Sequence, residues 1–367
     1  MELSVSPRFG VLLVNLGTPD SPRVPDVRRY LREFLMDKRV IDIPLLSRWL
    51  LVNLIIANFR APKSAKVYQK VWTQEGSPLK YYGFRTQALL QEALGEEYFV
   101  RLAMRYQKPS IKSVLKEFEG KHWEKLIIIP LFPQYASATT GSVKEAVMKE
   151  LSRWQTIPAV EFVQQFYQHP LFIKAFAELG RKHIEAHPYD HYLFTYHGLP
   201  ERQIRKADKH NYCLTHANTA EIGCCSSLNA KNSVCYRSQC FATTRLLAKA
   251  LNLPEGSYST AFQSRLGKAI WIQPYTEDVV KKLAQEGKKS VLAFSPSFVA
   301  DCLETTIEVG EEYKELFEEY GGEHWQLVES LNDSPTWIEL LRQMVLERTT
   351  KPKALDLMLQ VIAEEKE

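Results

Sequence analysis

Residues 10–19 read GVLLVNLGTP, and residues 192–200 read YLFTYHGLP. Each stretch is an apolar run that ends in a glycine and a proline, a pattern typical of a buried parallel strand followed by a turn. Ligands of open α/β sheets bind just beyond the carboxyl ends of the strands. The two stretches therefore favour two similar halves with a binding cleft between them.

The alternation of strands and helices continues along the rest of the chain. Five more apolar runs predict buried strands at 99–104, 126–131, 160–163, 258–262 and 290–294. Helical patterns accompany the strands, at 24–35, 139–154, 171–187, 241–251, 277–286 and 303–320. Alternation of this kind predicts the α/β class, with helices on both faces of parallel sheets.

Length, composition and charge limit the classes of protein that the chain can belong to. Its 367 residues are 45% hydrophobic, which is enough for a large core and for about two domains. The formal net charge is only +4, and no long basic block is present, so nucleic acid is not expected as a partner. The first ten residues lack the charged and apolar regions of a secretory signal.

The strongest apolar run, LLSRWLLVNLIIA at 45–57, is interrupted by Arg48 and Asn53. It is shorter than the roughly 20 residues that a membrane-spanning helix needs. We expect a cytoplasmic protein, with the cytoplasmic face of the inner membrane as one option. Because the cytoplasm is reducing, the six cysteines are expected to be thiols or metal ligands rather than disulfides.

Two groups of side chains have the chemistry of a metal site. His197 directly follows the strand at 192–196, at the mouth of the predicted cleft, where a neutral imidazole could bind a metal or accept a proton. Glu304, Glu308 and Glu312 recur every four residues, a row that drifts by ~40° per step on an α-helix. A π-type widening would bring the carboxylates nearly into line, and their oxygens could pass a divalent cation along the row. The alternatives are a loop histidine bonded to a backbone carbonyl and a solvated acidic face.

A third candidate site is the segment PQYASATTGS at 133–142, which lies between a strand and a helix. Hydroxyl groups and free backbone N–H groups at a helix start can bind a carboxylate or a phosphate. Ordinary capping of the helix by serine or threonine explains the same residues.

Together these segments resemble the ferrochelatases, the enzymes that insert ferrous iron into a porphyrin. The matching segments follow in order over nearly the whole chain, at 14–19, 30–44, 76–79, 133–142, 196–200, 262–276 and 298–304. The resemblance implies a chelatase-like fold of two Rossmann-like lobes, each a parallel sheet flanked by helices, with the porphyrin between them. The expected lobes are 1–165, which includes an apolar lip at 45–57, and 166–330, followed by a helical segment at 331–367 that packs back on the first lobe.

The resemblance also assigns roles to individual residues. His197 and Glu304 look like the pair at the metal-insertion centre, with Glu308 and Glu312 as a path for metal or protons. The residues expected to contact the porphyrin are Leu16, Arg105, Tyr106, Tyr135, Ser137, Thr139, Trp271 and Phe298. A ring bound against such walls could be buckled, which would expose its nitrogen lone pairs to the metal. The apolar lip would suit contact with a membrane surface, since porphyrins are poorly soluble.

The function implied is that of a lyase that inserts Fe²⁺ into protoporphyrin IX to form protohaem, in the last step of haem biosynthesis. A chelatase for coproporphyrin or for another metal, such as cobalt or nickel, is the nearest alternative. The segments 263–276 and 302–306 look more like the protoporphyrin enzymes. A non-catalytic tetrapyrrole carrier or an iron–sulfur sensor is the alternative from a different class.

An insertion at 206–239 is polar, has little periodicity and is unusually long for a loop. Its four cysteines are Cys213, Cys224, Cys225 and Cys235, and Cys240 follows in the next helix. Because some ferrochelatases bind a [2Fe–2S] cluster through cysteines, the resemblance favours such a cluster on these four, with Cys240 in reserve. The spacing is not the paired C-x-x-C pattern of zinc sites, but zinc and free redox-active thiols are the alternatives.

Overall fold

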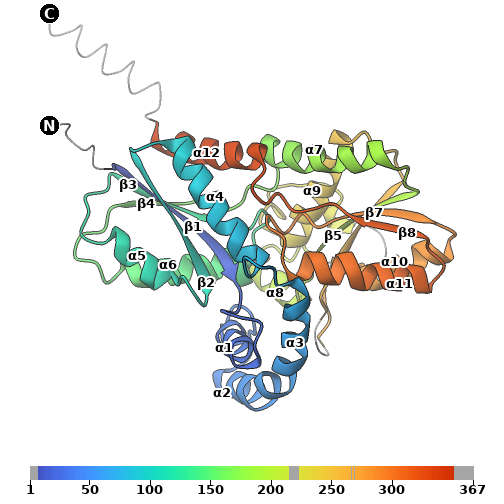
Figure 1. Ribbon diagram of the computed structural model, residues 1–367, viewed down its shortest axis with the longest axis horizontal. Coiled ribbons are helices and arrows are strands. Elements are labelled where there is room, and N and C mark those ends of the chain that lie inside the picture. The colour runs from blue at the N-terminus through green and yellow to red at the C-terminus, as the bar shows by residue number, and fades with distance from the viewer. Residues whose placement is uncertain (1–6, 215–222, 266, 268, 351–367) are drawn as a thin grey trace, which may run out of the picture.

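Two parallel sheets form the centre of the computed structural model, which describes residues 7–214, 223–265, 267 and 269–350 (Figure 1). In the described part of the chain each sheet has four strands, in the orders β2-β1-β3-β4 and β6-β5-β7-β8. The first sheet consists of β1 (Phe9–Gly17), β2 (Tyr98–Tyr106), β3 (Lys125–Pro130) and β4 (Ala159–Phe162). The second consists of β5 (His191–His197), β6 (Tyr258–Gln263), β7 (Ser290–Phe294) and β8 (His324–Leu327). The predicted α/β class is confirmed.

The central strands β1 and β5 occupy equivalent places in the two sheets. Each pairs in parallel with a neighbour on both sides, and nearly all residues of both strands are buried. Strands covered by helices on both faces need apolar residues at nearly every position, which is why continuous apolar runs identified them. Their carboxyl ends, at Gly17 and His197, carry the two glycine- and proline-containing turns.

Helices cover both sheets (Figure 1). Those of the first half are α1 (Val24–Leu35), α2 (Leu45–Leu50), η1 (Leu51–Ile56), α3 (Ala57–Val71), α4 (Pro78–Leu94), α5 (Ile111–Phe118), η2 (Ser137–Gly141) and α6 (Ser142–Leu151). Those of the second half are α7 (Pro170–Ala186), α8 (Glu201–Ala207), η3 (Gly223–Cys225), α9 (Tyr236–Ala250), α10 (Thr276–Gln285), η4 (Glu304–Glu312), α11 (Tyr313–Glu319) and α12 (Pro335–Thr349). Here η1, η2 and η4 are π-helical, and η3 is a 3₁₀ turn.

Helix α12 joins the two halves. It contacts α4 of the first and α7 of the second, and α12 and α7 lie along one edge of the molecule in Figure 1. At its end the Thr349 and Tyr98 hydroxyls are 2.8 Å apart, and Arg348 pairs with Glu161 at 3.2 Å. A continuous group of buried apolar side chains also runs from β1, β2 and β3 to β5, β6 and β7. The two lobes therefore share one core. The remainder of the helical segment expected at 331–367, from residue 351 on, lies outside the described residues.

The structure differs from the sequence prediction at several elements: no predicted range covers α4 and α5, and two further differences have a clear physical reason. Strand β8 was not predicted because its sequence, HWQL, is no apolar run, although Trp325 is buried against Phe317. Helix α9 begins at Tyr236, five residues before the predicted start. Its first turns bury polar side chains such as Gln239, whose amide donates to Gln165 at 2.7 Å, and this polarity hides the helical pattern. The insertion thus ends at Cys235, and its residues 215–222 lie outside the described part.

Helices α1, α2, η1 and α3 project together from the first sheet (Figure 1). Apolar contacts around Val52 and Ile56 hold this unit together, and the Arg28 guanidinium donates to the Ala57 carbonyl at 3.1 Å. None of the helices that the structure describes is long and apolar enough to cross a membrane.

Candidate active site

A cleft of about 1280 Å³, a volume that includes space open to solvent, lies between the two lobes at the carboxyl ends of β1 and β5. Most of its walls are apolar. Its lining includes Leu16, Tyr30, Tyr68, Thr139, His197, Tyr236, Trp271, Ser297, Phe298, Cys302 and Glu304.

His197 is the last residue of β5, and its imidazole lines the cleft. Its Nδ1 atom is 2.8 Å from the Gly198 carbonyl oxygen. A carbonyl only accepts hydrogen bonds, so Nδ1 carries the proton and the neutral ring has its lone pair on Nε2. The backbone contact considered as the alternative for this histidine therefore fixes the tautomer that can accept a proton or bind a metal.

Gly198 allows the wall beside His197 to form. A Cβ at this position would be 2.8 Å from the Gln263 backbone oxygen and 3.2 Å from Cε3 of Trp271. The first contact is closer than real Cβ atoms come and is with backbone, which cannot rotate away, whereas the second would push Trp271 back by a few tenths of an ångström. Glycine at 198 therefore allows β5 to end close against Gln263 and Trp271.

Leu16 is held at the equivalent turn of the first lobe. The next residue, Gly17, has a φ of +111°, and a Cβ there would overlap the backbone oxygen of Tyr106. Glycine is the residue that adopts this conformation without strain. The turns at Gly17 and Gly198 thus each place a cleft residue, Leu16 in one lobe and His197 in the other.

Glu304 is the first residue of η4, and protonated groups surround its carboxylate. The Cys302 thiol is hydrogen-bonded to it, and burial together with the Glu304 charge raises the pKa of this thiol well above its usual value. Burial and the same charge also raise the pKa values of the Tyr30 and Tyr68 phenols. The thiol and both phenols thus remain protonated at neutral pH.

The π-helix considered for the glutamate row is present throughout η4, but the three carboxylates are not equivalent. Only Glu304 is among the residues that line the cleft. Glu308 accepts hydrogen bonds from Ser264 at 2.5 Å and Gln263 at 3.1 Å. The pKa of Glu312 is raised, by burial first and then by the negative charge of Glu308.

Arg105 and Tyr106 are not among the residues that line the cleft. Both donate hydrogen bonds to Oδ2 of Asp37, at 2.7 Å from Arg105 and 2.9 Å from Tyr106. The Ser142 hydroxyl donates to the same oxygen at 2.5 Å. This carboxylate ties α1, β2 and α6 together, and the two side chains turn towards it because it is their charged partner.

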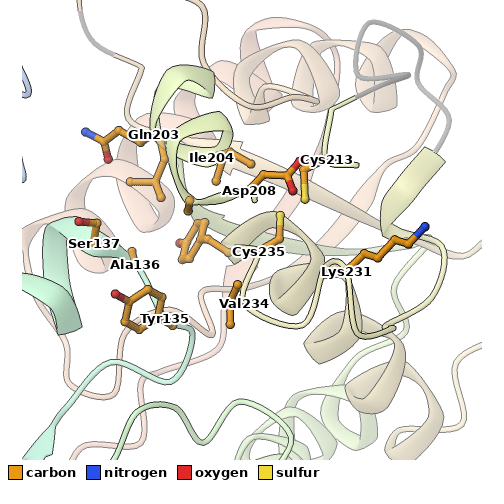
Figure 2. Close-up of a pocket in the computed structure, with 13 residues that line it drawn as sticks. Tyr135, Ala136, Ser137, Gln203, Ile204, Asp208, Cys213, Lys231, Val234 and Cys235 are labelled. Atoms are coloured by element: carbon orange, nitrogen blue, oxygen red, sulfur yellow. Dashed lines mark hydrogen bonds between the residues drawn. The ribbon is translucent and has the colours of Figure 1, made fainter. Parts of the chain in front are cut away.

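The segment 133–142 is divided between the cleft and a second pocket. Thr139 lines the cleft, whereas Tyr135 and Ser137 line a neighbouring pocket of about 430 Å³ (Figure 2). Ser137 accepts a hydrogen bond from the Arg39 guanidinium at 2.9 Å. The far side of this pocket is formed by the insertion, including Cys213 and Cys235.

The four cysteines of the insertion meet as a chain of contacts. The Cys224 and Cys225 sulfurs are 4.0 Å apart, and Cys235 contacts both Cys213 and Cys225. Figure 2 shows the sulfurs of Cys213 and Cys235 directed towards each other. The contact with Cys213 is the main cause that raises the pKa of Cys235 to about 12. Cys240 is also buried, and its thiol contacts the Tyr236 hydroxyl.

Among the residues that the structure describes, no three His, Cys, Asp or Glu side chains are placed to bind one metal ion. The cluster expected on the insertion therefore stays a prediction. The sequence pattern did not identify the cleft residues Tyr30, Tyr68 and Tyr236. A tyrosine on the apolar face of a helix has the same spacing whether it packs in the core or lines a cleft.

The family model for ferrochelatases matches residues 8–349. The chain belongs to the ferrochelatase family. A ferrochelatase from Legionella pneumophila (strain Lens) is 46% identical to this chain over 341 residues, which are 93% of this chain and 99% of the relative. One from Coxiella burnetii (strain Dugway 5J108-111) is 43% identical over 337 residues, 92% of this chain and 93% of the relative.

Comparison with solved structures supports the fold. The structure titled "SirB from Bacillus subtilis with Fe3+" matches with a TM-score of 0.50 and 11% sequence identity. The match covers 93% of this chain and 95% of that chain. The prediction of a chelatase-like α/β fold is confirmed, and so is the prediction of an enzyme of the metal chelatase class.

Proposed function

We propose that this enzyme inserts Fe²⁺ into protoporphyrin IX and forms protohaem, the last step of haem biosynthesis. The observation that carries this proposal is that His197 and Glu304 line one large, mostly apolar cleft. An aromatic macrocycle fits such walls, and the imidazole and the carboxylate offer a proton acceptor and a ligand for a divalent cation.

Metal insertion releases the two N–H protons of the free porphyrin as Fe²⁺ takes their place. His197 accepts a proton at Nε2, the ring atom that its contact with Gly198 leaves free. The Glu304 carboxylate takes the other proton or holds the incoming ion. Trp271, Phe298 and Leu16 press on the faces of the ring, and binding energy from the rest of the macrocycle supports a bent geometry.

The cleft favours protoporphyrin over coproporphyrin. Coproporphyrin carries four propionates, whereas protoporphyrin IX carries two propionates and two apolar vinyl groups. None of the described residues that line the cleft is a lysine or an arginine, so four carboxylates would lack cationic partners within it. The alternative metals and the carrier alternative are distinguished by assay.

The test is an anaerobic assay in which purified protein is offered each porphyrin with Fe²⁺, Co²⁺ or Ni²⁺. We expect the absorbance of protohaem to appear fastest. Faster turnover of coproporphyrin, or of another metal, would replace the proposed substrate, and porphyrin binding without turnover would favour a carrier.

We further propose that Cys213, Cys224, Cys225 and Cys235 bind a [2Fe–2S] cluster. Their pairwise contacts bring four thiols together, which is the number of cysteine ligands that a [2Fe–2S] cluster takes. The Arg237 guanidinium donates to the Cys225 sulfur at 3.1 Å. The Leu214 N–H donates to the Cys224 sulfur at 3.4 Å. Such donors stabilise thiolate ligands.

Iron and sulfide analysis of anaerobically purified protein tests the cluster. We expect about two of each per chain and a visible absorbance that Cys225→Ser removes. Cys240→Ser is the matched control, since Cys240 contacts Tyr236 instead, and it should keep the colour. A colourless protein with one zinc per chain would contradict the cluster. When bound, the cluster supplies a structural tie and a one-electron redox centre, and no step of metal insertion needs it.

We propose as well that the apolar lip at 45–57, formed by α2, η1 and the first residue of α3, rests on the membrane, at its cytoplasmic face. Its exposed apolar side chains are Leu45, Leu46, Trp49, Leu50, Leu54 and Ile55, and Phe59 of α3 lies just beyond it; Leu46 is 71% and Phe59 72% exposed. A contiguous exposed group of this kind marks an interaction surface. Arg60, Lys63 and Lys66 of α3 are also exposed and would attract anionic lipids.

Co-sedimentation with anionic phospholipid vesicles tests the lip. Leu46→Glu combined with Leu54→Glu is expected to reduce binding at least tenfold, because two charges would enter the apolar region of the interface. Ile157→Glu, at an apolar residue of similar exposure outside the lip, should bind as the parent does. Parent protein that stays in the supernatant would contradict membrane contact.

A further inference from the structure

Tyr236 stands between the cysteine insertion and the cleft. It directly follows Cys235, is the first residue of α9, and its side chain is 7% exposed. It lines both the cleft and the smaller pocket shown in Figure 2. No other residue of the described part lies next to a cysteine of the insertion and also lines the cleft.

The Tyr236 hydroxyl joins two strand ends. Its oxygen is 2.9 Å from the backbone oxygen of His197, at the end of β5. It is also 3.1 Å from the Ser297 hydroxyl, in the turn after β7. Because a carbonyl can only accept, Tyr236 donates to His197 and Ser297 donates to Tyr236. A buried phenol with both bonds made fixes the relative position of the two segments.

Both segments carry side chains of the proposed metal-insertion site in the cleft. His197 presents its imidazole to the cleft, and Ser297 is followed by Phe298 in the cleft wall. The Phe298 and His197 ring centroids are 6.5 Å apart. A shift of the Tyr236 oxygen would therefore move the proton acceptor and one wall of the porphyrin site together.

The backbone of Tyr236 is tied to the cysteines. Cys235 contacts Cys213 and Cys225 through its sulfur, and its N–H donates to the Asn232 carbonyl at 2.9 Å. Consecutive Cα atoms are 3.80 Å apart across a trans peptide, so Tyr236 cannot keep its place if Cys235 moves. The geometry points to Tyr236 as a positioning residue that transmits the state of the cysteine cluster to His197 and Phe298. This inference rests on the proposed function of the cleft.

Tyr236→Phe tests the link, because it removes only the hydroxyl. We expect kcat to fall about tenfold, as for the loss of one buried hydrogen bond that orients a reacting group, with the dissociation constant for protoporphyrin IX within about twofold of the parent value. Tyr196→Phe is the matched control. Tyr196 is equally buried and adjoins His197 in β5, but its hydroxyl bonds Thr244, so kcat should be unchanged.

Transmission itself is measured by a double-mutant cycle with Cys213→Ser, which disturbs the cysteine cluster from its far end. We expect Cys213→Ser to lower kcat in the parent and in Tyr196→Phe, and to add no further loss in Tyr236→Phe. Additive losses would overturn the inference. The cycle does not need a cluster to be present, so it remains decisive if the metal analysis fails.

A second readout does not involve turnover. The midpoint potential of the [2Fe–2S] cluster can be measured from the electron paramagnetic resonance signal of its reduced form. Free protoporphyrin IX is diamagnetic, so the measurement can be made with and without it. We expect bound porphyrin to shift this potential in the parent and in Tyr196→Phe but not in Tyr236→Phe. The same shift in Tyr236→Phe would overturn the inference. A parent protein without turnover would instead contradict the proposed function.

Discussion

A His197→Ala variant is expected to bind protoporphyrin IX like the parent but to lose about 10²- to 10⁴-fold in kcat, the usual contribution of a positioned proton acceptor. His197 is the one histidine among the described residues that line the cleft. Its Nδ1–H group donates to the Gly198 carbonyl, so Nε2 is the ring nitrogen that can accept a proton. Fluorescence titration of the porphyrin separates binding from turnover.

Added imidazole provides a sharper test of the same variant. The cavity left by the side chain can admit a free imidazole, and we expect it to restore part of the activity of His197→Ala and none in the parent. His122→Ala, at an exposed histidine remote from the cleft residues, should keep full turnover. Full turnover in His197→Ala would remove the histidine from the mechanism.

Glu304→Gln is expected to lower the rate of iron insertion by at least about 10²-fold while the protein stays folded. The amide keeps the size of the carboxylate and can still accept from the Cys302 thiol, but it cannot take a proton or balance the charge of Fe²⁺. If the carboxylate holds the ion, the KM for Fe²⁺ rises; if it takes a proton, kcat falls at constant KM.

Glu311→Gln is the control for this substitution. Glu311 is in the same π-helix but is exposed and pairs with Lys70 at 3.3 Å, so its neutralisation should leave both constants unchanged. Parent values of kcat and KM in Glu304→Gln would show that the carboxylate has no part in the reaction.

The fold could be predicted because parallel strands buried on both faces leave a clear record in the sequence. β1 and β5 are nearly continuous apolar runs; β1 ends in Gly17 and β5 is followed by Gly198, and close packing requires a glycine at both positions. The apolar sequence pattern is weaker where an element buries polar side chains that form hydrogen bonds inside the protein. The start of α9 was misjudged for this reason, since Gln239 is fully buried but makes its hydrogen bonds inside the protein.

The candidate site was predictable in part. His197, Glu304, Trp271 and Phe298 lie close to strand ends or turns, where the sequence marks the cleft. The direction of a side chain depends on its tertiary partners, which sequence spacing does not reveal. Arg105 turns to Asp37, a residue 68 positions away in the chain, and no local pattern announces that pair.

The core shared by both lobes has a mechanical consequence. Helix α12 rests on α4 and α7 at once, and buried apolar side chains continue from one sheet to the other. Hinging the halves apart would bring this common interior into water, at a cost that grows with the apolar area exposed. If the cleft binds a porphyrin as proposed, the ring would be bent by its fit to walls whose separation the shared core fixes, without a movement of one lobe towards the other.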